Sequence, residues 1–222
     1  DAADIQKEYQ AYYEQKKQLL QNYWDAELES FMDRYVDGSG FCRVITPAIY
    51  WVMFAEAATP EQAEKMIRFL RDPQKLGGKY PFPSLAIDDP DLAEDGGYWL
   101  GGIWLPTAYM TVKALEIYGH AELGQELALR LLKQMWTVYR DFEPHTIWEC
   151  YSPLADLPAK NKRNAWVRQD FCGWSALGPI SMFIENVLGI YHISAAEKKI
   201  CWRLTHAGRH GIRNLRIGED TV

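Results

Sequence analysis

Residues 146–153, TIWECYSP, place one carboxylate among aromatic rings, because Glu149 directly follows Trp148 and is followed closely by Tyr151. Two further stretches, YWLGGIWLPTAY at 98–109 and DFCGWSALGP at 170–179, place more aromatic rings beside glycines. Aromatic faces stack on the apolar C–H face of a sugar ring, while a carboxylate can act on the anomeric carbon or its water. Burial beside an indole raises the pKa of a carboxyl group, which suits general acid or base chemistry. The pattern therefore points to carbohydrate chemistry centred on Glu149.

Each stretch also has a purely structural interpretation. Glu149 can cap or pair with a neighbouring loop while the rings around it pack in the core. Gly101 and Gly102 can permit a tight turn at a loop-to-helix junction, with Trp104 facing the core. The spacing alone leaves both interpretations open.

A second working carboxylate is harder to find. Asp170 fits an ordinary acid at a helix N-terminus, where the helix dipole favours negative charge, and Trp174 near it fits a core edge. Asp88, Asp89 and Asp95 lie in a loop with several like charges, which argues against a proton-donating acid there.

Other chemistries lack their motifs. The sequence contains no HExxH, no Gly-x-Ser-x-Gly, no phosphate-cradling glycine loop and no dinucleotide-binding glycine pattern. The four cysteines are widely separated, which favours buried small hydrophobic residues over disulfides or zinc ligands. We therefore expect neither a metal nor a cofactor.

Composition is that of a globular protein rich in aromatic residues. Hydrophobic residues make up 48%, charged residues 24% and aromatic residues 14% of the 222 positions, and the formal net charge is −6. No basic run stands out, so we expect no nucleic-acid partner. The longest apolar stretch is interrupted by Glu185 and Asn186 and falls short of a membrane span, so we expect no membrane partner.

The elements that must position these residues are mainly helical. Thr46-Pro47 and Thr59-Pro60 each combine an N-cap threonine with a proline at the first helical position, and Gln62 completes a capping box at the second. The Gly119–His120 break predicts an antiparallel hairpin of two helices. Helical spacing of apolar residues predicts helices over 3–24, 47–58, 60–72, 104–118, 121–139 and 174–188.

The remaining segments predict a functional loop and some β-structure. The loop over 72–102 is long and rich in Pro, Gly and Asp, which favours a functional role. DGSG at 37–40 predicts a short hairpin, and segments 198–205 and 210–222 alternate like strands without evident partners. We divide the chain into a helical part, 1–192, and the start of an accessory β-strand region, 193–222. The uncapped first helix and the unpaired last strand lead us to expect a fragment of a longer protein.

Taken in order, five segments resemble the C-terminal half of the catalytic domain of trehalase-like glycoside hydrolases, which include processing α-glucosidase I and mannosylglycerate hydrolase. The family has an aromatic YWRGP-I/V-W turn before a helix, then a WE-x-Y segment, then a GW segment that opens the last helix. The resemblance covers residues 3–190. The segments are TPAIYWVMFA (46–55), YPFPSLAIDDPD (80–91), YWLGGIWLPTAYM (98–110), WECYSP (148–153) and DFCGWSALGPISMFIENVLGI (170–190).

The resemblance implies a mainly α fold, part of an (α/α)6 toroid built from helical hairpins, with a short β-hairpin and accessory C-terminal strands. It implies an inverting, α-glucosidase-like hydrolase of α-linked di- or oligosaccharides. Glu149 aligns with the general base that activates water. The family's general acid is an aspartate on the other half of the toroid. We therefore expect the chain to need the remainder of its parent to close the toroid, and to be inactive alone. The predicted substrate-binding residues are Tyr98, Trp99, Trp104, Trp148, Trp174, Ser84 and Arg43.

Two positions depart from the family pattern, and they keep other functions open. Leu100 stands where Arg is usual, which removes a fork of hydrogen-bond donors to sugar hydroxyls, and Gly102 stands where Pro is usual. A carbohydrate-binding or scaffolding toroid without catalysis is therefore the second hypothesis. A polysaccharide lyase or sugar epimerase is the third, but it needs a histidine in the cleft. The nearest, His145, lies outside the matched motifs.

Overall fold

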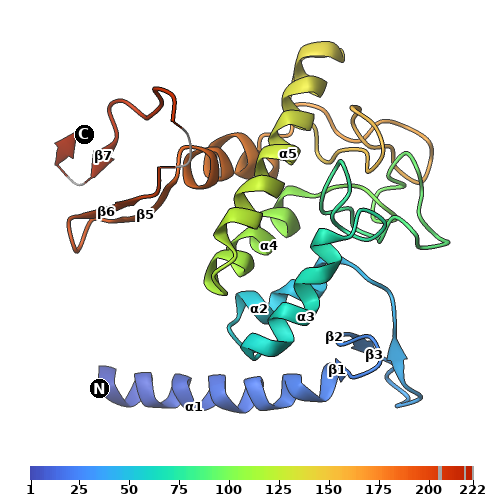
Figure 1. Ribbon diagram of the computed structural model, residues 1–222, viewed down its shortest axis with the longest axis vertical. Coiled ribbons are helices and arrows are strands. Elements are labelled where there is room, and N and C mark those ends of the chain that lie inside the picture. Colours follow the sequence, from blue (N-terminus) through green and yellow to red (C-terminus); the bar gives the residue numbers. More distant parts are fainter. Residues whose placement is uncertain (205–206, 218, 222) are drawn as a thin grey trace.

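The computed structural model describes residues 1–204, 207–217 and 219–221 of the chain. Within these ranges helices dominate, and the strands form small two-stranded antiparallel sheets (Figure 1). The mainly helical expectation is thus confirmed. The α-helices are α1 (Ala2–Leu20), α2 (Trp51–Phe54), α3 (Pro60–Arg71), α4 (Leu105–Ile117) and α5 (Ala121–Asp141).

The hairpin of α4 and α5 lies at the centre of the molecule (Figure 1). Gly119 between the two helices has φ +83°, a backbone conformation that glycine adopts without strain. Leu105, Leu115, Leu127 and Leu131 are all fully buried. Each such leucine contributes about 1.5–3 kcal/mol relative to an exposed one. The predicted helical hairpin is confirmed.

Helix α1 differs from the other helices because none of its residues is buried. The sequence predicted an uncapped start, which is wrong: a carboxylate oxygen of Asp1 accepts the backbone N–H of Ala3 at 2.8 Å and that of Asp4 at 3.1 Å. The helix is shorter than predicted, because a 3₁₀ turn, η1 (Gln21–Tyr23), follows it. Its N-terminal end projects beyond the other helices (Figure 1), whereas the Tyr13 hydroxyl bonds to the Ala55 and Glu56 carbonyls.

Both Thr-Pro helix starts occur as predicted. The Thr46 hydroxyl accepts the Ala48 N–H at 3.2 Å, and the Thr59 hydroxyl accepts the Gln62 N–H at 3.2 Å while the Gln62 side chain accepts the Thr59 N–H at 2.8 Å. The first of these helices is divided, because a 3₁₀ segment, η2 (Pro47–Tyr50), precedes the single turn of α2.

The short hairpin at DGSG is confirmed. Strands β3 (Asp33–Arg34) and β4 (Phe41–Cys42) pair antiparallel around it, and Gly38 in the turn has φ +77°. A second small pair precedes it, formed by β1 (Trp24–Asp25) and β2 (Ser30–Phe31), which the sequence did not predict.

The predicted last helix exists but is not an α-helix. Its first turn is a 3₁₀ segment, η3 (Trp174–Leu177), and the rest is a π-helix, η4 (Gly178–Val187). Gly178 lets the segment approach α4 and α5 closely, because a Cβ there would lie 2.6 Å from the sulfur of Met135 and 3.0 Å from a methyl of Leu105. Apolar spacing predicts the helical turn but not its hydrogen-bond pattern.

The expectation of unpaired C-terminal strands is wrong for the described residues. Strand β6 (Lys199–Trp202) pairs antiparallel with β5 (Ile190–Ser194). Gly189, at φ +83°, follows the π-helix and allows a tight turn directly into β5. The sequence did not predict this turn or the strand after it. Further on, β7 (Arg216–Ile217) pairs with β8 (Asp220–Thr221). Predicted strand positions 205, 218 and 222 lie outside the described residues, and the division of the chain at 192/193 stays a prediction.

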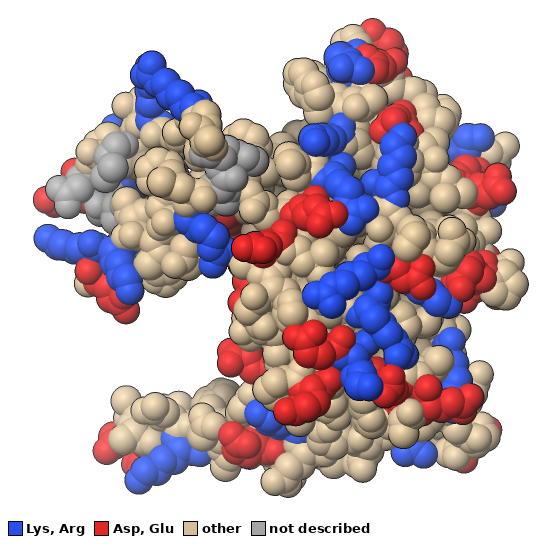
Figure 2. Space-filling model, in the orientation of Figure 1, with Lys and Arg blue, Asp and Glu red and all other residues tan. Residues whose placement is uncertain are grey.

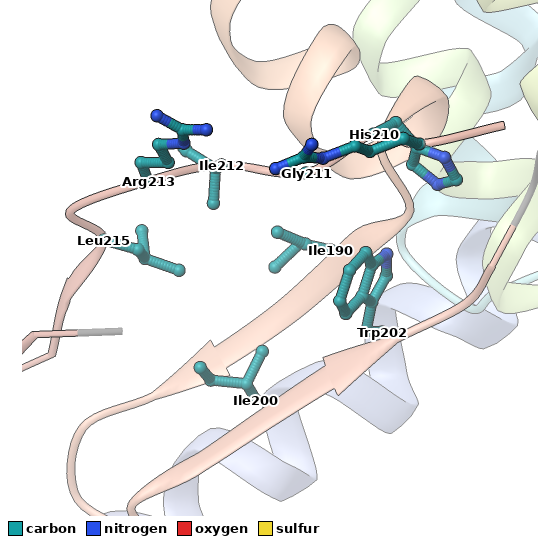
Figure 3. A pocket seen from close by; sticks show the side chains of 9 residues that line it. Ile190, Ile200, Trp202, His210, Gly211, Ile212, Arg213 and Leu215 are labelled. Atoms are coloured by element: carbon teal, nitrogen blue, oxygen red, sulfur yellow. The ribbon is translucent and has the colours of Figure 1, made fainter.

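A cavity of about 480 Å³ lies among these strands (Figure 3). Ile212 and Leu215 face Ile190 and Ile200 across it, whereas the side chain of Arg213 points away (Figure 3). None of the predicted sugar-binding residues lines it. The cavity therefore belongs to the packing of the C-terminal strands.

The surface view shows acidic and basic side chains interspersed over one face, and a hollow between α1 and the C-terminal strands (Figure 2). In the described part of the chain, no helix combines the length and the apolar character needed to cross a membrane.

A short ladder of backbone pairs joins the two aromatic loops predicted to form the site. The Ile103 N–H donates to the Tyr151 carbonyl at 2.8 Å, and the Tyr151 N–H donates back to Ile103 at 3.1 Å. The ladder continues from Ile103 to Pro83 and from Tyr151 to Pro158. Proline lacks a donor and is therefore tolerated at the margins of such pairing. The pairing brings YWLGGIW and WECYSP side by side.

The glycines of the first loop form a closed turn. The Gly102 N–H donates to the Gly96 carbonyl at 2.8 Å, and Gly101 has φ +146°. A Cβ on Gly102 would lie 2.4 Å from the Tyr98 carbonyl oxygen. The family's proline would also lack the N–H that Gly96 accepts. Glycine at 102 therefore matches the turn that this chain forms.

We expect Gly102→Ala to destabilise the fold by about 1–3 kcal/mol, because the new methyl meets rigid backbone rather than a movable side chain. Urea unfolding followed by circular dichroism measures the change. Gly208→Ala is the matched control, since nothing lies within 4 Å of its added Cβ. Equal unfolding midpoints for the two variants would contradict the steric account.

Candidate active site

Four of the predicted site residues form one cluster of rings. Trp99 stacks on Trp104 with centroids 4.0 Å apart and planes 8° from parallel. Tyr98 meets Trp104 edge-on at 4.7 Å and 90°, and the Trp174 ring lies 6.0 Å from that of Trp104 at 66°. Edge and offset arrangements of this kind are favourable for aromatic pairs.

The three indole rings of the cluster differ in exposure: one is buried and two are partly exposed. Trp104 is 1% exposed, whereas Trp99 is 49% and Trp174 is 43% exposed. Trp104 therefore supports Trp99 from below, as the structural interpretation expected. Trp99 and Trp174 remain open to a ligand, and exposed indoles held in place by packing are typical of a binding surface.

Glu149 lies half-buried beside this cluster. Its Oε1 accepts the Tyr98 hydroxyl at 3.2 Å, and its Oε2 accepts the backbone N–H of Arg168 at 3.3 Å. Its own backbone is fixed as well, because its N–H donates to the Arg168 carbonyl at 2.9 Å and its carbonyl accepts the Ser175 hydroxyl at 3.0 Å. Glu149 is therefore held by three separate segments of the chain, two of which bond to its carboxylate.

Tyr98 is suited to donate this hydrogen bond. Burial and then the adjacent Glu149 charge raise the pKa of Tyr98, so its hydroxyl stays protonated at neutral pH. Burial, followed by the Glu149 charge, likewise raises the pKa of the Cys150 thiol, which therefore stays uncharged. Glu149 is thus flanked by neutral groups on these two sides.

Three predicted residues lie apart from the rings. Trp148 is only 3% exposed and packs edge-on against Phe142 at 5.6 Å, so it is part of the core. Ser84 is buried, and its hydroxyl accepts the Gly101 N–H at 3.0 Å, which stabilises the glycine turn. The Arg43 guanidinium forms an ion pair with Asp25 at 2.6 Å. In this structure each of the three has a structural partner.

Sequence reasoning missed three residues beside the site. Phe171 packs against Trp174 at 5.1 Å, and the Arg168 guanidinium lies over the Phe171 ring at 5.5 Å. The Lys160 carbonyl accepts the Tyr98 N–H at 2.9 Å. Phe171 could have been found from its place in DFCGW. Arg168 and Lys160 carry no such signal, because they contribute mainly through backbone groups.

The other candidate carboxylates have local partners of their own. Asp170 accepts the Thr146 hydroxyl at 2.7 Å, Asp88 pairs with Lys75 at 2.6 Å, and Asp95 accepts the Gly97 N–H at 3.3 Å. None of these contacts involves Glu149. Over the described ranges, no group of three or more His, Cys, Asp or Glu side chains is arranged to hold a metal ion.

Comparison with known sequences identifies the family of this chain. The family model described as the mannosylglycerate hydrolase MGH1-like glycoside hydrolase domain matches residues 1–171. The probable mannosyl-oligosaccharide glucosidase of Schizosaccharomyces pombe is 24% identical over 186 residues, which cover 77% of this chain and 22% of that protein.

Comparison with solved structures shows a shared fold. The GH63 mannosylglycerate hydrolase of Thermus thermophilus, in its complex with Tris, has a TM-score of 0.56 and 22% identity, covering 72% of this chain and 34% of its own. The neutral trehalase of Saccharomyces cerevisiae has a TM-score of 0.57 and 21% identity, covering 74% and 28%.

This chain therefore spans about a third or less of each of these relatives. Because the family model spans most of the chain, these 222 residues belong to the MGH1-like glycoside hydrolase family.

Proposed function

We propose that this chain carries the water-activating half of an inverting glycoside hydrolase site, with Glu149 as the general base. The observation that carries the proposal is the Glu149 carboxylate, held by Tyr98 and Arg168 at the edge of the ring cluster. A carboxylate accepts at about four lone-pair positions, so two remain for water after these contacts. A sugar ring resting on Trp99 or Trp174 would lie beside that water.

The reaction divides between two carboxyl groups. Glu149 takes a proton from water while the water oxygen bonds to the anomeric carbon and the bond to the leaving oxygen breaks. A carboxylic acid on the opposite side of the sugar ring protonates that oxygen. In inverting enzymes the two carboxyl groups lie roughly 6.5–9.5 Å apart, leaving room for the water.

The acid partner is proposed to lie outside this chain. Asp170 and Asp88 each have a local partner, and the chain spans about a third or less of its relatives. We therefore propose that these residues form part of an (α/α)6 toroid, and that further helices of a longer parent protein close it. The isolated chain is then inactive.

The substrate is proposed to be an α-linked di- or oligosaccharide. Support comes from the likeness to mannosyl-oligosaccharide glucosidase and from the open indoles of Trp99 and Trp174. Leu100, which is 38% exposed, presents an apolar side chain at the edge of this surface. Sugar hydroxyls near Leu100 must therefore find their hydrogen-bond partners elsewhere.

Glu149→Gln in the full-length protein is expected to lower kcat by about 10²–10⁴-fold, because an amide cannot accept the proton from water. Hydrolysis of a panel of α-linked disaccharides and aryl α-glycosides measures the loss. Glu8→Gln, on the exposed face of α1, is the matched control and should leave turnover unchanged. Retention of more than about a tenth of the activity by Glu149→Gln would refute the role of general base.

Trp99→Ala is expected to raise KM about 10-fold with a smaller effect on kcat, because aromatic stacking contributes about 0.5–1.5 kcal/mol in addition to the buried area. Trp136→Ala is the control, since Trp136 is also exposed and stacked, on Tyr139 at 6.0 Å, but on helix α5. Equal effects of the two variants on KM would contradict a sugar surface at Trp99.

A second candidate function is sugar binding without turnover. The leucine at position 100 favours it, because a guanidinium there would have donated several hydrogen bonds to hydroxyls. Calorimetry that detects sugar binding by the full-length protein, together with no turnover across the same panel, would support this alternative.

A further inference from the structure

We propose that Tyr98 is a positioning residue that holds the Glu149 carboxylate in one orientation. This inference rests on the proposed role of Glu149, but it concerns a contact that can be measured without turnover. The contact is the 3.2 Å hydrogen bond from the Tyr98 hydroxyl to Oε1.

Tyr98 is itself fixed at several points. Its backbone has φ +66°, in the left-handed region that few side-chain-bearing residues adopt. Its N–H donates to the Lys160 carbonyl at 2.9 Å, and its carbonyl accepts the indole N–H of Trp104 at 3.2 Å. The Tyr98 ring therefore has little freedom to turn away from Glu149. Such strained positions persist when the surroundings determine them fully.

The second carboxylate oxygen is occupied from the opposite loop. The Arg168 N–H donates to Oε2 at 3.3 Å. One donor on each oxygen prevents rotation of the carboxylate about its last bond. The lone pairs left free therefore point in fixed directions, which is what a base needs to meet a water in line with a sugar carbon.

The titratable groups around Glu149 act in different ways. Tyr98 and Cys150 have raised pKa values and stay neutral near neutral pH. The Arg168 guanidinium stacks over Phe171, at 5.5 Å from the ring centre. Lys160, behind Tyr98, donates from its ammonium group to Asn164 at 2.7 Å, and Asp170 accepts from Thr146. Of these side chains, only the Tyr98 hydroxyl bonds to the carboxylate.

The chain contains a matched pair away from the site. The Tyr109 hydroxyl donates to Glu185 at 3.0 Å, and burial followed by the Glu185 charge raises the pKa of Tyr109 to about 12. Tyr109→Phe removes the same chemical group from the same kind of partner, on helix α4. It therefore controls for the general cost of losing a tyrosine–glutamate hydrogen bond.

The first experiment compares kcat and KM of Tyr98→Phe, Tyr109→Phe and the unchanged full-length protein at neutral pH. We expect Tyr98→Phe to lower kcat about 10-fold, with KM changed less than about threefold, since hydrogen bonds to charged groups contribute roughly this much. Tyr109→Phe should leave both constants unchanged. A kcat for Tyr98→Phe equal to that of Tyr109→Phe or of the unchanged protein would overturn the inference.

The second experiment needs no turnover. The ¹³C-carboxyl spectrum of the full-length protein labelled at glutamate is recorded at neutral pH, and the signal absent from Glu149→Gln is assigned to position 149. Its chemical shift should change in Tyr98→Phe, because the carboxylate loses a donated hydrogen bond, and stay in place in Tyr109→Phe. An unchanged signal in Tyr98→Phe would overturn the inference. A changed signal, combined with an active Glu149→Gln enzyme, would uphold the contact while removing the proposed base role.

Discussion

The site depends on a single reciprocal backbone pairing, the two hydrogen bonds between Ile103 and Tyr151. These residues belong to loops that are distant in the sequence, and neither loop has regular secondary structure of its own. The pair fixes the register between them, because shifting it by one residue would turn every neighbouring side chain to the other side. In this register the Tyr98 hydroxyl reaches the Glu149 carboxylate. The pair itself is shielded, since Ile103 and Tyr151 are both essentially buried.

Around this pairing, apolar packing holds the aromatic rings in place, whereas hydrogen bonds orient the carboxylate. Trp104 is sandwiched between the core and Trp99, so its burial anchors the aromatic surface without contacting a ligand. The carboxylate is oriented by hydrogen bonds from two loops. Glycine at 102 permits the turn that carries the aromatic rings and Tyr98, since this close turn leaves no room for a side chain at that position. A substitution in the turn would therefore disturb the aromatic surface and the carboxylate together.

Much of the helical frame could be predicted from the sequence, because it follows local rules. The Thr59 capping box and the Gly119 break each depend on a few neighbouring residues, and both occur as expected. The gathering of Tyr98, Trp99, Trp104 and Glu149 was also predicted, through the resemblance of ordered motifs.

The failures concern features set by distant parts of the chain. Trp148 adjoins Glu149 in sequence, but its ring packs against Phe142 in the core, a partner that the local pattern does not indicate. The pairing of β5 with β6 depends on where the preceding helix ends. The role of Arg168 is carried by its backbone N–H, which every residue except proline possesses. No side-chain pattern reveals such contacts.

Helix α1 leads to a different kind of consequence. Residues 1–16 are all exposed, and the helix is tied to the α2–α3 connection at Tyr13, whose hydroxyl bonds to the Ala55 and Glu56 carbonyls. Most helical stability in proteins comes from tertiary packing, which the turns before Tyr13 lack, so the Asp1 cap, local side-chain pairs and intrinsic propensity must sustain them. Unless another surface covers them, those turns will unravel and re-form many times for each opening of the α4–α5 hairpin. Their amide hydrogens will then exchange with solvent long before those of the core.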